Sequence, residues 1–485
     1  MRHNWKIIGS FLGLLLAING LFMLLCLPFS LYFNEGDWVA LLASGLLTLG
    51  VGAALWTLKS KAKSKELKKR DGYLIVTLGW LAMSLFGCLP FVLSGAIPNL
   101  TDAFFETMSG FTTTGATILV DIEGVHKGLL FWRSMTQWIG GMGIIVLTVA
   151  ILPILGIGGM QLFVAEAPGI APDKLKPRIQ ATAKRLWLVY AGLTVIECVL
   201  LMLGGMGFYD AINHSLTTMA TGGFSTKNAS VDHFTSPYIQ YVITVFMFLA
   251  GTSFTLNYFM FKGKFSKFWT NEEFRYYFLS TLIFTLITAV TVYFVTDDGI
   301  EKSFRDAVFQ VVSIITTTGY GTSDYTTWTP FITMLFFIMM FVGGSAGSTA
   351  GGIKIVRHVI LFKNSALELK RQLHPSAVMP VRFNNKAVSQ QITFNVLAFF
   401  IIFISIFAFS SLVISMMGLN FETAVSAVAT CIGNIGPGLD SVGPKANFSH
   451  LPGAAKWLLS FLMLLGRLEL FTVLMLITPY YWKKT

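Results

Sequence analysis

Long apolar stretches alternate with short basic segments along the whole chain. Ten of these stretches approach or exceed the length of about 20 residues that a helix needs to cross a bilayer. Their arrangement in pairs, each pair bounded by basic clusters, predicts an all-α polytopic membrane protein. The ten predicted spans are residues 7–33, 38–57, 73–95, 128–152, 186–207, 237–261, 276–296, 329–352, 391–418 and 455–480.

The composition agrees with a membrane protein and argues against other classes. Of the 485 residues, 54% are hydrophobic and 12% are charged, whereas soluble domains carry about 25% charged residues. The mean hydropathy of +0.67 excludes a disordered chain and argues against a soluble multidomain enzyme. All four cysteines lie in apolar stretches without C-x-x-C spacing, so neither a disulfide framework nor a zinc site is expected.

The net charge of +11 is explained by where the charges lie. Most basic residues gather in six clusters, which are the N-terminus, 59–70, 174–185, 262–275, 354–386 and the C-terminal tail. Because basic loops stay in the cytoplasm, we expect all six clusters and both termini there, and no nucleic-acid partner. Acidic residues exceed basic ones in the opposite loops, and such an excess concentrates cations. The charge pattern therefore favours a cation as cargo.

Four of the outer loops share a pattern that predicts an internal repeat. Each begins with an acidic residue (Asp102, Asp210, Asp306 or Glu422) and continues as an apolar segment too short to span. The pattern predicts four parallel copies of a unit made of span, half-helix, loop and span. We expect the acid to cap the half-helix, whose C-terminal end then points into the membrane and stabilises a cation. The expected regions are a two-span region at 1–70 and pore repeats one to four at 71–171, 172–262, 263–353 and 354–485.

A Thr- or Gly-rich tetrad follows each half-helix and predicts a selectivity filter built from backbone carbonyls. Non-helical backbone at membrane depth is tolerated only where it is buried in protein or lines a wet cavity. Four extended strands around one axis can replace the hydration shell of a potassium ion, as in potassium-channel filters. Aligning the tetrads on one glycine each gives the candidate filter residues Thr113, Thr114 and Gly115; Ala220, Thr221 and Gly222; Thr317, Thr318 and Gly319; and Cys431, Ile432 and Gly433.

These repeats and their filter glycines resemble the Trk/Ktr/HKT superfamily of cation transporters. The resemblance covers residues 73–482, and the first two spans match the extra N-terminal pair of its bacterial TrkH type, the membrane subunit of Trk potassium-uptake systems. It implies a homodimer in the bacterial inner membrane, with a cytosolic TrkA-type nucleotide-binding ring as regulator. It also implies K+ as the transported ion, with rubidium accepted, sodium left open and no organic cofactor. Members that prefer sodium carry a serine at the first filter glycine, whereas this chain keeps Gly115, so potassium is favoured.

A run of small residues predicts an intramembrane gate below this filter. Residues 343–352 include five glycines and will not hold a continuous helix, and in the family this loop is the gate. Arg467 lies opposite the loop in the aligned repeats, and a cation inside a span costs about 2.5–3.5 kcal/mol. We expect it to be an electrostatic barrier and to donate hydrogen bonds to 345–350; pairing with Glu469 or Glu197 is the structural alternative. The candidate gate residues are Gly343, Gly344, Ser345, Gly347, Ser348, Thr349, Gly351, Gly352 and Arg467.

Two other classes of function are left open by the residues alone. A potassium symporter coupled to protons or sodium usually needs an intramembrane acid, for which Glu197 and Glu469 are the candidates, but repeats in such proteins are often inverted. A membrane-embedded enzyme has less support, because the histidines form no H-E-x-x-H motif and GGSAGSTAGG lacks the G-K-[ST] ending of a phosphate-binding loop. We therefore expect a channel-like potassium pore without enzyme activity, and nucleotide control only through a partner.

Overall fold

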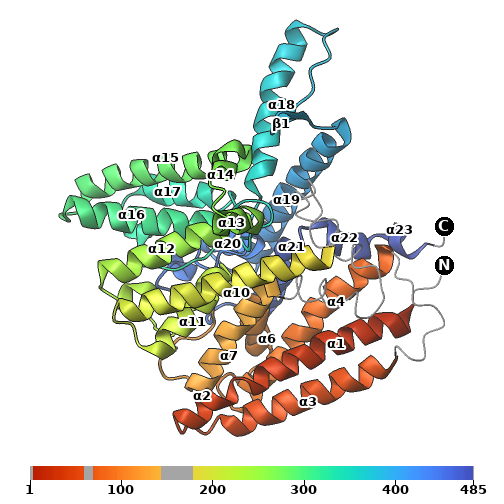
Figure 1. The fold of residues 1–485 in the computed structure, drawn as a ribbon, viewed down its shortest axis with the longest axis vertical. Helices are drawn as coiled ribbons and strands as arrows, with labels where there is room; N and C mark the ends of the chain where they lie inside the picture. Colours follow the sequence, from red (N-terminus) through yellow and green to blue (C-terminus); the bar gives the residue numbers. More distant parts are fainter. Residues whose placement is uncertain (1–3, 59–68, 144–178, 484–485) are drawn as a thin grey trace.

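The computed structural model describes residues 4–58, 69–143 and 179–483, and within them the regular secondary structure is almost entirely helical (Figure 1). Among the described residues, the only β-structure is one short antiparallel hairpin, formed by β1 (Arg382–Phe383) and β2 (Lys386–Ala387). The first helices are α1 (Trp5–Leu24), α2 (Leu27–Tyr32), α3 (Trp38–Trp56), α4 (Lys69–Gly87), α5 (Leu89–Leu93), α6 (Leu100–Phe111), α7 (Lys127–Trp138) and the π-helical turn η2 (Ile139–Gly143).

The middle of the chain repeats this alternation of long and short helices. Its elements are α10 (Ile179–Leu203), α11 (Phe208–Met219), η3 (Ser230–His233), α12 (Pro237–Gly251), α13 (Phe254–Phe261), α14 (Ser266–Thr270), α15 (Glu272–Val295), α16 (Ile300–Ile315), η4 (Tyr325–Thr327) and α17 (Pro330–Met339). The last part holds α18 (Ile355–Leu373), α19 (Gln390–Met416), α20 (Phe421–Gly433), η5 (Asp440–Val442), α21 (Gly453–Arg467), α22 (Phe471–Ile477) and α23 (Pro479–Trp482).

Among the described residues, six helices are long and apolar enough to cross a membrane. Counting each of two bent helix pairs as one further span raises this number to eight. The bent pairs are α12 with α13 and α21 with α22, which turn by 114° and 119°. The predicted span 128–152 is described only as far as residue 143, and the predicted span 329–352 begins with the ten-residue helix α17. The count of ten spans therefore stays a prediction, whereas several apolar spanning helices are found.

The first two spans pack closely through glycines. A β-carbon added to Gly13 would lie 2.6 Å from the backbone oxygen of Gly52, and one added to Gly20 would lie 2.7 Å from that of Gly45. Small residues of this kind let two membrane helices approach each other to backbone contact. The pair α1 and α3 lies side by side at one edge of the molecule, next to α4 (Figure 1).

Four helices, α6, α11, α16 and α20, are too short to cross a bilayer. They contain 12, 12, 16 and 13 residues, which at about 1.5 Å per residue is less than the roughly 30 Å of a hydrocarbon core. The predicted half-helices are thus present, but the prediction that acids cap them is wrong. Asn99 and Asn420 cap α6 and α20 with their side chains, and the N-cap residues of α11 and α16 are glycines.

The predicted capping acids lie inside the helices because an N-cap residue needs a non-helical backbone. Asp102, Asp210 and Glu422 occupy first turns, where they still oppose the positive end of the helix dipole. Asp306 lies further along α16, whose first turn holds Glu301 instead. Two of these acids tie the helix to other elements: Asp102 pairs with Lys456 of α21 at 2.6 Å, and Asp210 accepts from the Thr226 hydroxyl at 2.6 Å.

Helix α18 and the β1–β2 hairpin form an arm that projects from the helical body (Figure 1). This arm contains the basic cluster 354–386, and its outer face exposes large apolar side chains such as Phe362 and Leu369. Much of the other predicted basic clusters 59–70 and 174–185 lies outside the described residues.

Candidate functional site

All four half-helices end in the same backbone turn. In α6, α11 and α16 the residue after the C-cap has a left-handed conformation, with φ of 54° at Thr113, 53° at Thr221 and 56° at Thr317. In α20 the C-cap residue itself, Asn434, has this conformation, with φ of 53°. One residue later a backbone N–H returns five residues to a helix carbonyl, which defines a Schellman motif. These bonds join Thr114 to Ser109, Gly222 to Thr217, Thr318 to Ser313 and Ile435 to Thr430, at 2.8–3.0 Å.

The left-handed threonines are unusual. A β-branched residue with positive φ is strained, and such residues persist where the surrounding structure holds them, often at functional sites. Three of the four equivalent positions here are threonines, and all four residues are fully buried. The shared conformation therefore marks the four loops that follow the half-helices as one constructed feature. We call them the first (112–118), second (220–226), third (316–323) and fourth (433–439) loop.

A glycine with positive φ lies two residues after each left-handed residue. These glycines are Gly115 (82°), Gly223 (73°), Gly319 (80°) and Gly436 (102°). The predicted alignment is right for the first and third loops but is shifted in the others, where it used Gly222 and Gly433. Gly433 is the last residue of α20, and Cys431 and Ile432 belong to its last turn. The residues equivalent to Thr113, Thr114 and Gly115 are therefore Thr221, Gly222 and Gly223, then Thr317, Thr318 and Gly319, then Asn434, Ile435 and Gly436.

These four glycines connect the loops into a closed ring. Each lies against the backbone oxygen of the residue that precedes the glycine in the next loop. An added β-carbon would lie 2.2 Å from Gly222 O at Gly115, 1.9 Å from Thr318 O at Gly223, 2.0 Å from Ile435 O at Gly319, and 2.7 Å from Thr114 O at Gly436. Real β-carbons essentially never approach that closely. The last contact returns to the first loop, so the loops surround one axis in sequence order.

A polar side chain on each half-helix holds the loop that follows it. In the first three half-helices it lies seven residues before the left-handed position: Glu106 accepts from Ile118 N at 2.9 Å, His214 contacts Ser225 Oγ at 3.0 Å, and Gln310 donates to Ser323 O at 2.9 Å. In the fourth half-helix Ser426 accepts from Leu439 N at 3.0 Å. Because these groups are buried, each loop is held by hydrogen bonds that water does not replace.

The first and second loops are joined by a buried ion pair. Arg133 of α7 contacts Glu106 at 2.7 Å, and the two side chains are 3% and 0% exposed. The same guanidinium donates to Ser225 O at 3.0 Å and lies over the ring of Phe224 at 3.5 Å. Gln137, one turn further along α7, donates to Gly222 O at 2.6 Å and accepts from Phe224 N at 3.1 Å. Helix α7 thus positions the second loop through two side chains.

The third loop is held in a different way. The ring of Tyr320 is buried against α11, where its hydroxyl contacts the hydroxyl of Thr217 and donates to His214 O at 3.2 Å. Its backbone oxygen accepts from Ser313 Oγ at 2.7 Å. The residues equivalent to Tyr320 are Ala116, Phe224 and Pro437, so the outer supports of the four loops are chemically distinct.

Below the ring, residues 340–354 contain no helix, as the run of small residues predicted. The loop formed by 343–354 contacts the ends of three half-helices. Thr349 Oγ1 donates to Met219 O at 3.0 Å, Gly351 N donates to Thr317 Oγ1 at 2.6 Å, and a β-carbon on Gly351 would lie 2.4 Å from Gly433 O. This segment therefore lies next to the ring, against the C-terminal ends of these half-helices.

The other predicted gate residues form the body of this loop. Gly343 N donates to Ile353 O at 2.9 Å, Ser345 N to Gly251 O at 2.9 Å, and Ser348 Oγ to Ser345 O at 2.6 Å. Backbone oxygens of Gly344 and Gly347 accept from Ile355 N and Phe254 N, at 3.2 and 3.0 Å. Gly347 and Gly352 have positive φ values of 76° and 65°, which explains why glycine is needed at both turns.

Arg467 connects this loop to the turn η2. Its Nη1 donates to Thr349 O at 2.8 Å, and its Nη2 donates to Gly141 O at 2.6 Å and Gly140 O at 2.5 Å. The two glycines belong to η2, directly after α7. The predicted hydrogen bonds to 345–350 are therefore present. The alternative partner Glu469 instead pairs with Arg357 of α18, and the other alternative, Glu197, is buried in α10.

The structure places the first and third predicted triads, and part of the second, in the ring, and all nine predicted gate residues in or against the loop below it. Sequence reasoning missed Gly223, Asn434, Ile435 and Gly436 in the ring and Glu106 and Gln137 around it. One signal was available for the glycines. A buried hydroxyl residue lies six residues before each ring glycine, and its carbonyl accepts the N–H bond of the Schellman motif; these residues are Ser109, Thr217, Ser313 and Thr430.

Comparisons with known proteins agree with this architecture over nearly the whole chain. The TrkH family, described as cation transport proteins, matches residues 39–484. The Trk system potassium uptake protein TrkH of Salmonella typhimurium is 42% identical over 99% of this chain and 100% of its own length. Its namesake from Halomonas elongata is 40% identical over 99% of both chains.

A solved structure gives the same result. The crystal structure of the potassium transporter TrkH from Vibrio parahaemolyticus superposes with a TM-score of 0.88 at 38% identity, and the match covers 99% of this chain and 100% of that one. Sequence and fold therefore agree from end to end. The chain belongs to the TrkH family of cation transport proteins, which are transporters and not enzymes.

Proposed function

We propose that this chain takes up potassium through a channel-like pore whose selectivity filter is the ring of four loops. The closed set of glycine–carbonyl contacts is the observation that carries the proposal. The half-helices end at the ring, so their C-terminal dipole ends, with a partial negative charge, face the same axis and stabilise a cation there. Carbonyls around such an axis can replace the hydration shell of potassium or rubidium. The relatives that are named for potassium uptake are similar to this chain over nearly its whole length.

The filter that we propose uses the register of the turns. Its carbonyl-bearing residues are Thr113, Thr114 and Gly115; Thr221, Gly222 and Gly223; Thr317, Thr318 and Gly319; and Asn434, Ile435 and Gly436. The loop 343–354 is the gate. Arg467 holds that loop through Thr349 O and places a positive charge below the filter, which is an added barrier for a cation.

The surrounding assembly follows from the family and the charge pattern. We infer ten spans in the bacterial inner membrane, the five regions bounded at residues 70, 171, 262 and 353, and cytoplasmic termini. The basic arm around α18 would then face the cytosol, where a TrkA-type nucleotide-binding ring could dock, and two copies of the chain would form a homodimer. A cysteine placed at Lys370 tests this orientation, because all four native cysteines are buried; its labelling from outside intact cells would contradict it.

Rubidium uptake into liposomes that contain the purified chain tests the proposed function. Rubidium uptake should be driven by a potassium gradient directed out of the liposomes, and it should need no proton or sodium gradient. A strict requirement for a proton or sodium gradient would instead support the coupled symporter. Absence of rubidium uptake under a potassium, proton or sodium gradient, by well-folded protein, would contradict both.

A further inference from the structure

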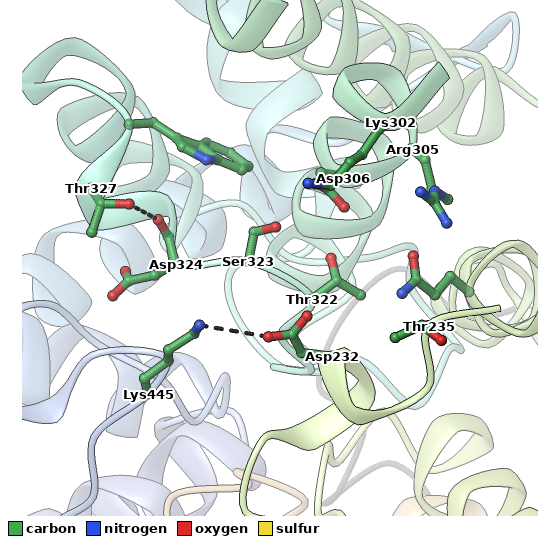
Figure 2. A pocket seen from close by; sticks show the side chains of 12 residues that line it. Asp232, Thr235, Lys302, Arg305, Asp306, Thr322, Ser323, Asp324, Thr327 and Lys445 are labelled. Atoms are coloured by element: carbon green, nitrogen blue, oxygen red, sulfur yellow. Dashed lines mark hydrogen bonds and ion pairs between the residues drawn. The ribbon is translucent and has the colours of Figure 1, made fainter. Parts of the chain in front are cut away.

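A cavity of about 560 Å³ lies between the N-terminal half of α16, the start of α12, and the end of the third loop with the segment that follows it (Figure 2). Thr322 and Ser323, in its wall, come three and four residues after Gly319. The side chains that line it are mostly polar or charged: Asp232, Thr235, Gln240, Lys302, Arg305, Asp306, Thr322, Ser323, Asp324, Thr327, Trp328 and Lys445. None of the proposed filter or gate residues is among them.

The ion pairs around this cavity leave a negative excess. Among the described residues, each basic side chain of the lining already has an acidic partner: Lys302 has Asp298 at 2.8 Å, Arg305 has Glu301 at 3.3 Å, and Lys445 has Asp232 at 3.6 Å. No described ion pair includes Asp306 or Asp324, and both line the cavity. Three acidic and three basic side chains line the cavity, but two of the basic ones pair with Asp298 and Glu301, which lie outside the lining. With these partners counted, two carboxylates in the wall are left without a basic partner in the described structure, and this favours a cation.

Two buried oxygens in the cavity wall point to a ligand or ordered water. Thr322 and Gln240 are 4% and 6% exposed, and in the described structure the Thr322 hydroxyl and the Gln240 amide oxygen have no hydrogen-bond partner. Buried polar atoms are almost always satisfied, so such atoms in a cavity wall indicate that something polar fills the cavity. In Figure 2 the Thr322 hydroxyl points between Ser323 and Asp306.

The size of the cavity decides which form of cation it takes. Within the described residues, no three His, Cys, Asp or Glu side chains are close enough together to hold a metal ion directly. A water molecule occupies about 30 Å³ of liquid, so the cavity has room for a cation with its complete first hydration shell. A hydrated monovalent ion fits this volume.

We propose that this cavity is an outer binding site for the hydrated transported cation, held by the carboxylates of Asp306 and Asp324 and by the oxygens of Thr322 and Gln240. This proposal rests on the proposed function, because the bound ion is the one that next enters the filter. The site raises the local cation concentration at the outer mouth. Lys445 opposes cation binding, because its positively charged ammonium group, 3.6 Å from Asp232, repels a cation in the cavity.

The test separates cation capture from passage through the filter. Rubidium uptake by the full chain in liposomes gives KM and maximal rate for Asp306→Asn, Asp324→Asn and Lys445→Gln. One unit charge in a hydrated site changes affinity by about two- to fourfold. The two aspartate variants should therefore raise KM by that factor, Lys445→Gln should lower it, and all three should keep the maximal rate. Added salt of an impermeant cation should shrink these differences, because it screens exposed charges.

Asp297→Asn is the matched control, because Asp297 is exposed on the same face and does not line the cavity. An equal rise in KM for this variant would show that diffuse surface charge is responsible and would overturn the site. Unchanged KM in Asp324→Asn and Lys445→Gln, or a rise in the latter, would overturn it as well. If Asp306→Asn does not fold, the other two variants still decide. A wild-type chain that takes up no rubidium would refute the proposed function itself, whereas normal uptake with unaltered KM refutes only the outer site.

Discussion

Gly436 lies directly against the backbone oxygen of Thr114, so closely that a β-carbon on the glycine would be 2.7 Å from that oxygen. The two residues belong to the last and the first half-helix loops of the chain. Their contact closes the ring that the other three glycine–carbonyl contacts begin. It also means that the ring depends on glycine at four positions for steric as well as conformational reasons, since all four have positive φ.

This register gives a prediction within the fourth loop. Gly436→Ala should weaken discrimination between potassium and sodium, because its β-carbon is strained at a φ of 102° and pushes on Thr114 O. Gly433→Ala should have a smaller effect, because Gly433 has no positive φ and its β-carbon would meet the movable end of the Ile435 side chain at 2.9 Å and Met340 O at 3.2 Å. Sodium inhibition of rubidium uptake measures the difference. Equal effects of the two variants would contradict the register.

The gate makes a prediction about Arg467. Arg467→Ala should raise rubidium flux about tenfold or more, because each charge-assisted hydrogen bond is worth about 1.5–3 kcal/mol and 1.4 kcal/mol is a factor of ten. Arg467→Lys keeps the charge but cannot reach Thr349 O, Gly140 O and Gly141 O together, so we expect an intermediate flux. Flux per folded protein is the measurement. A well-folded Arg467→Ala protein that conducts no faster would refute the gate.

The buried pair Glu106–Arg133 should be a major contribution to stability. Removing one partner of such a pair costs about 3–5 kcal/mol, because the remaining charge stays buried. Glu106→Gln should therefore lower the thermal midpoint of the purified protein strongly. Asp298→Asn breaks the exposed pair with Lys302, in which the lysine and aspartate side chains are 53% and 32% exposed, and should cost less than about 1 kcal/mol. Similar midpoints for both variants would show that the buried pair does not hold the first and second loops.

Acid should lower the stability of the segment that follows the fourth loop, because of Asp440. Hydrogen bonds from the side chains of Asn420 and Thr423 lower the pKa of this carboxyl. A depressed pKa contributes stability that is present above the ordinary aspartate pKa and is lost as pH falls through the folded-state value. Asp440→Asn should therefore lose less stability than wild type between pH 6 and pH 3. Parallel loss of the thermal midpoint in both proteins would contradict the assignment.

Much of the architecture follows from patterns that are local in the sequence. Apolar stretches of spanning length, acid-led segments too short to span, and five glycines in 343–352 each depend on the properties of neighbouring residues. The non-helical segment and the short half-helices are therefore where the sequence predicts them. The partner of Arg467 was also predictable, because repeats aligned in parallel bring equivalent positions to the same depth.

The register of the second and fourth loops was not predictable from glycines alone. Gly222 and Gly223 are adjacent, and Gly433 precedes Gly436 by three residues, so glycine identity fits more than one alignment. Which glycine needs positive φ is decided by where the Schellman turn ends each half-helix. The ties of Glu106 to Arg133 and of Gln137 to Gly222 join separate elements, and no periodicity along the chain encodes such contacts.

The ring as a potassium filter is tested most directly by the reversal potential of single channels under potassium on one side and sodium on the other. The purified chain, carrying Arg467→Ala to favour opening, should reverse at a potential that shows preference for potassium. Adding Gly115→Ser, whose side chain would press on Gly222 O, should move the reversal potential toward zero. A wild-type ring without preference, or a Gly115→Ser ring with unchanged preference, would contradict the filter.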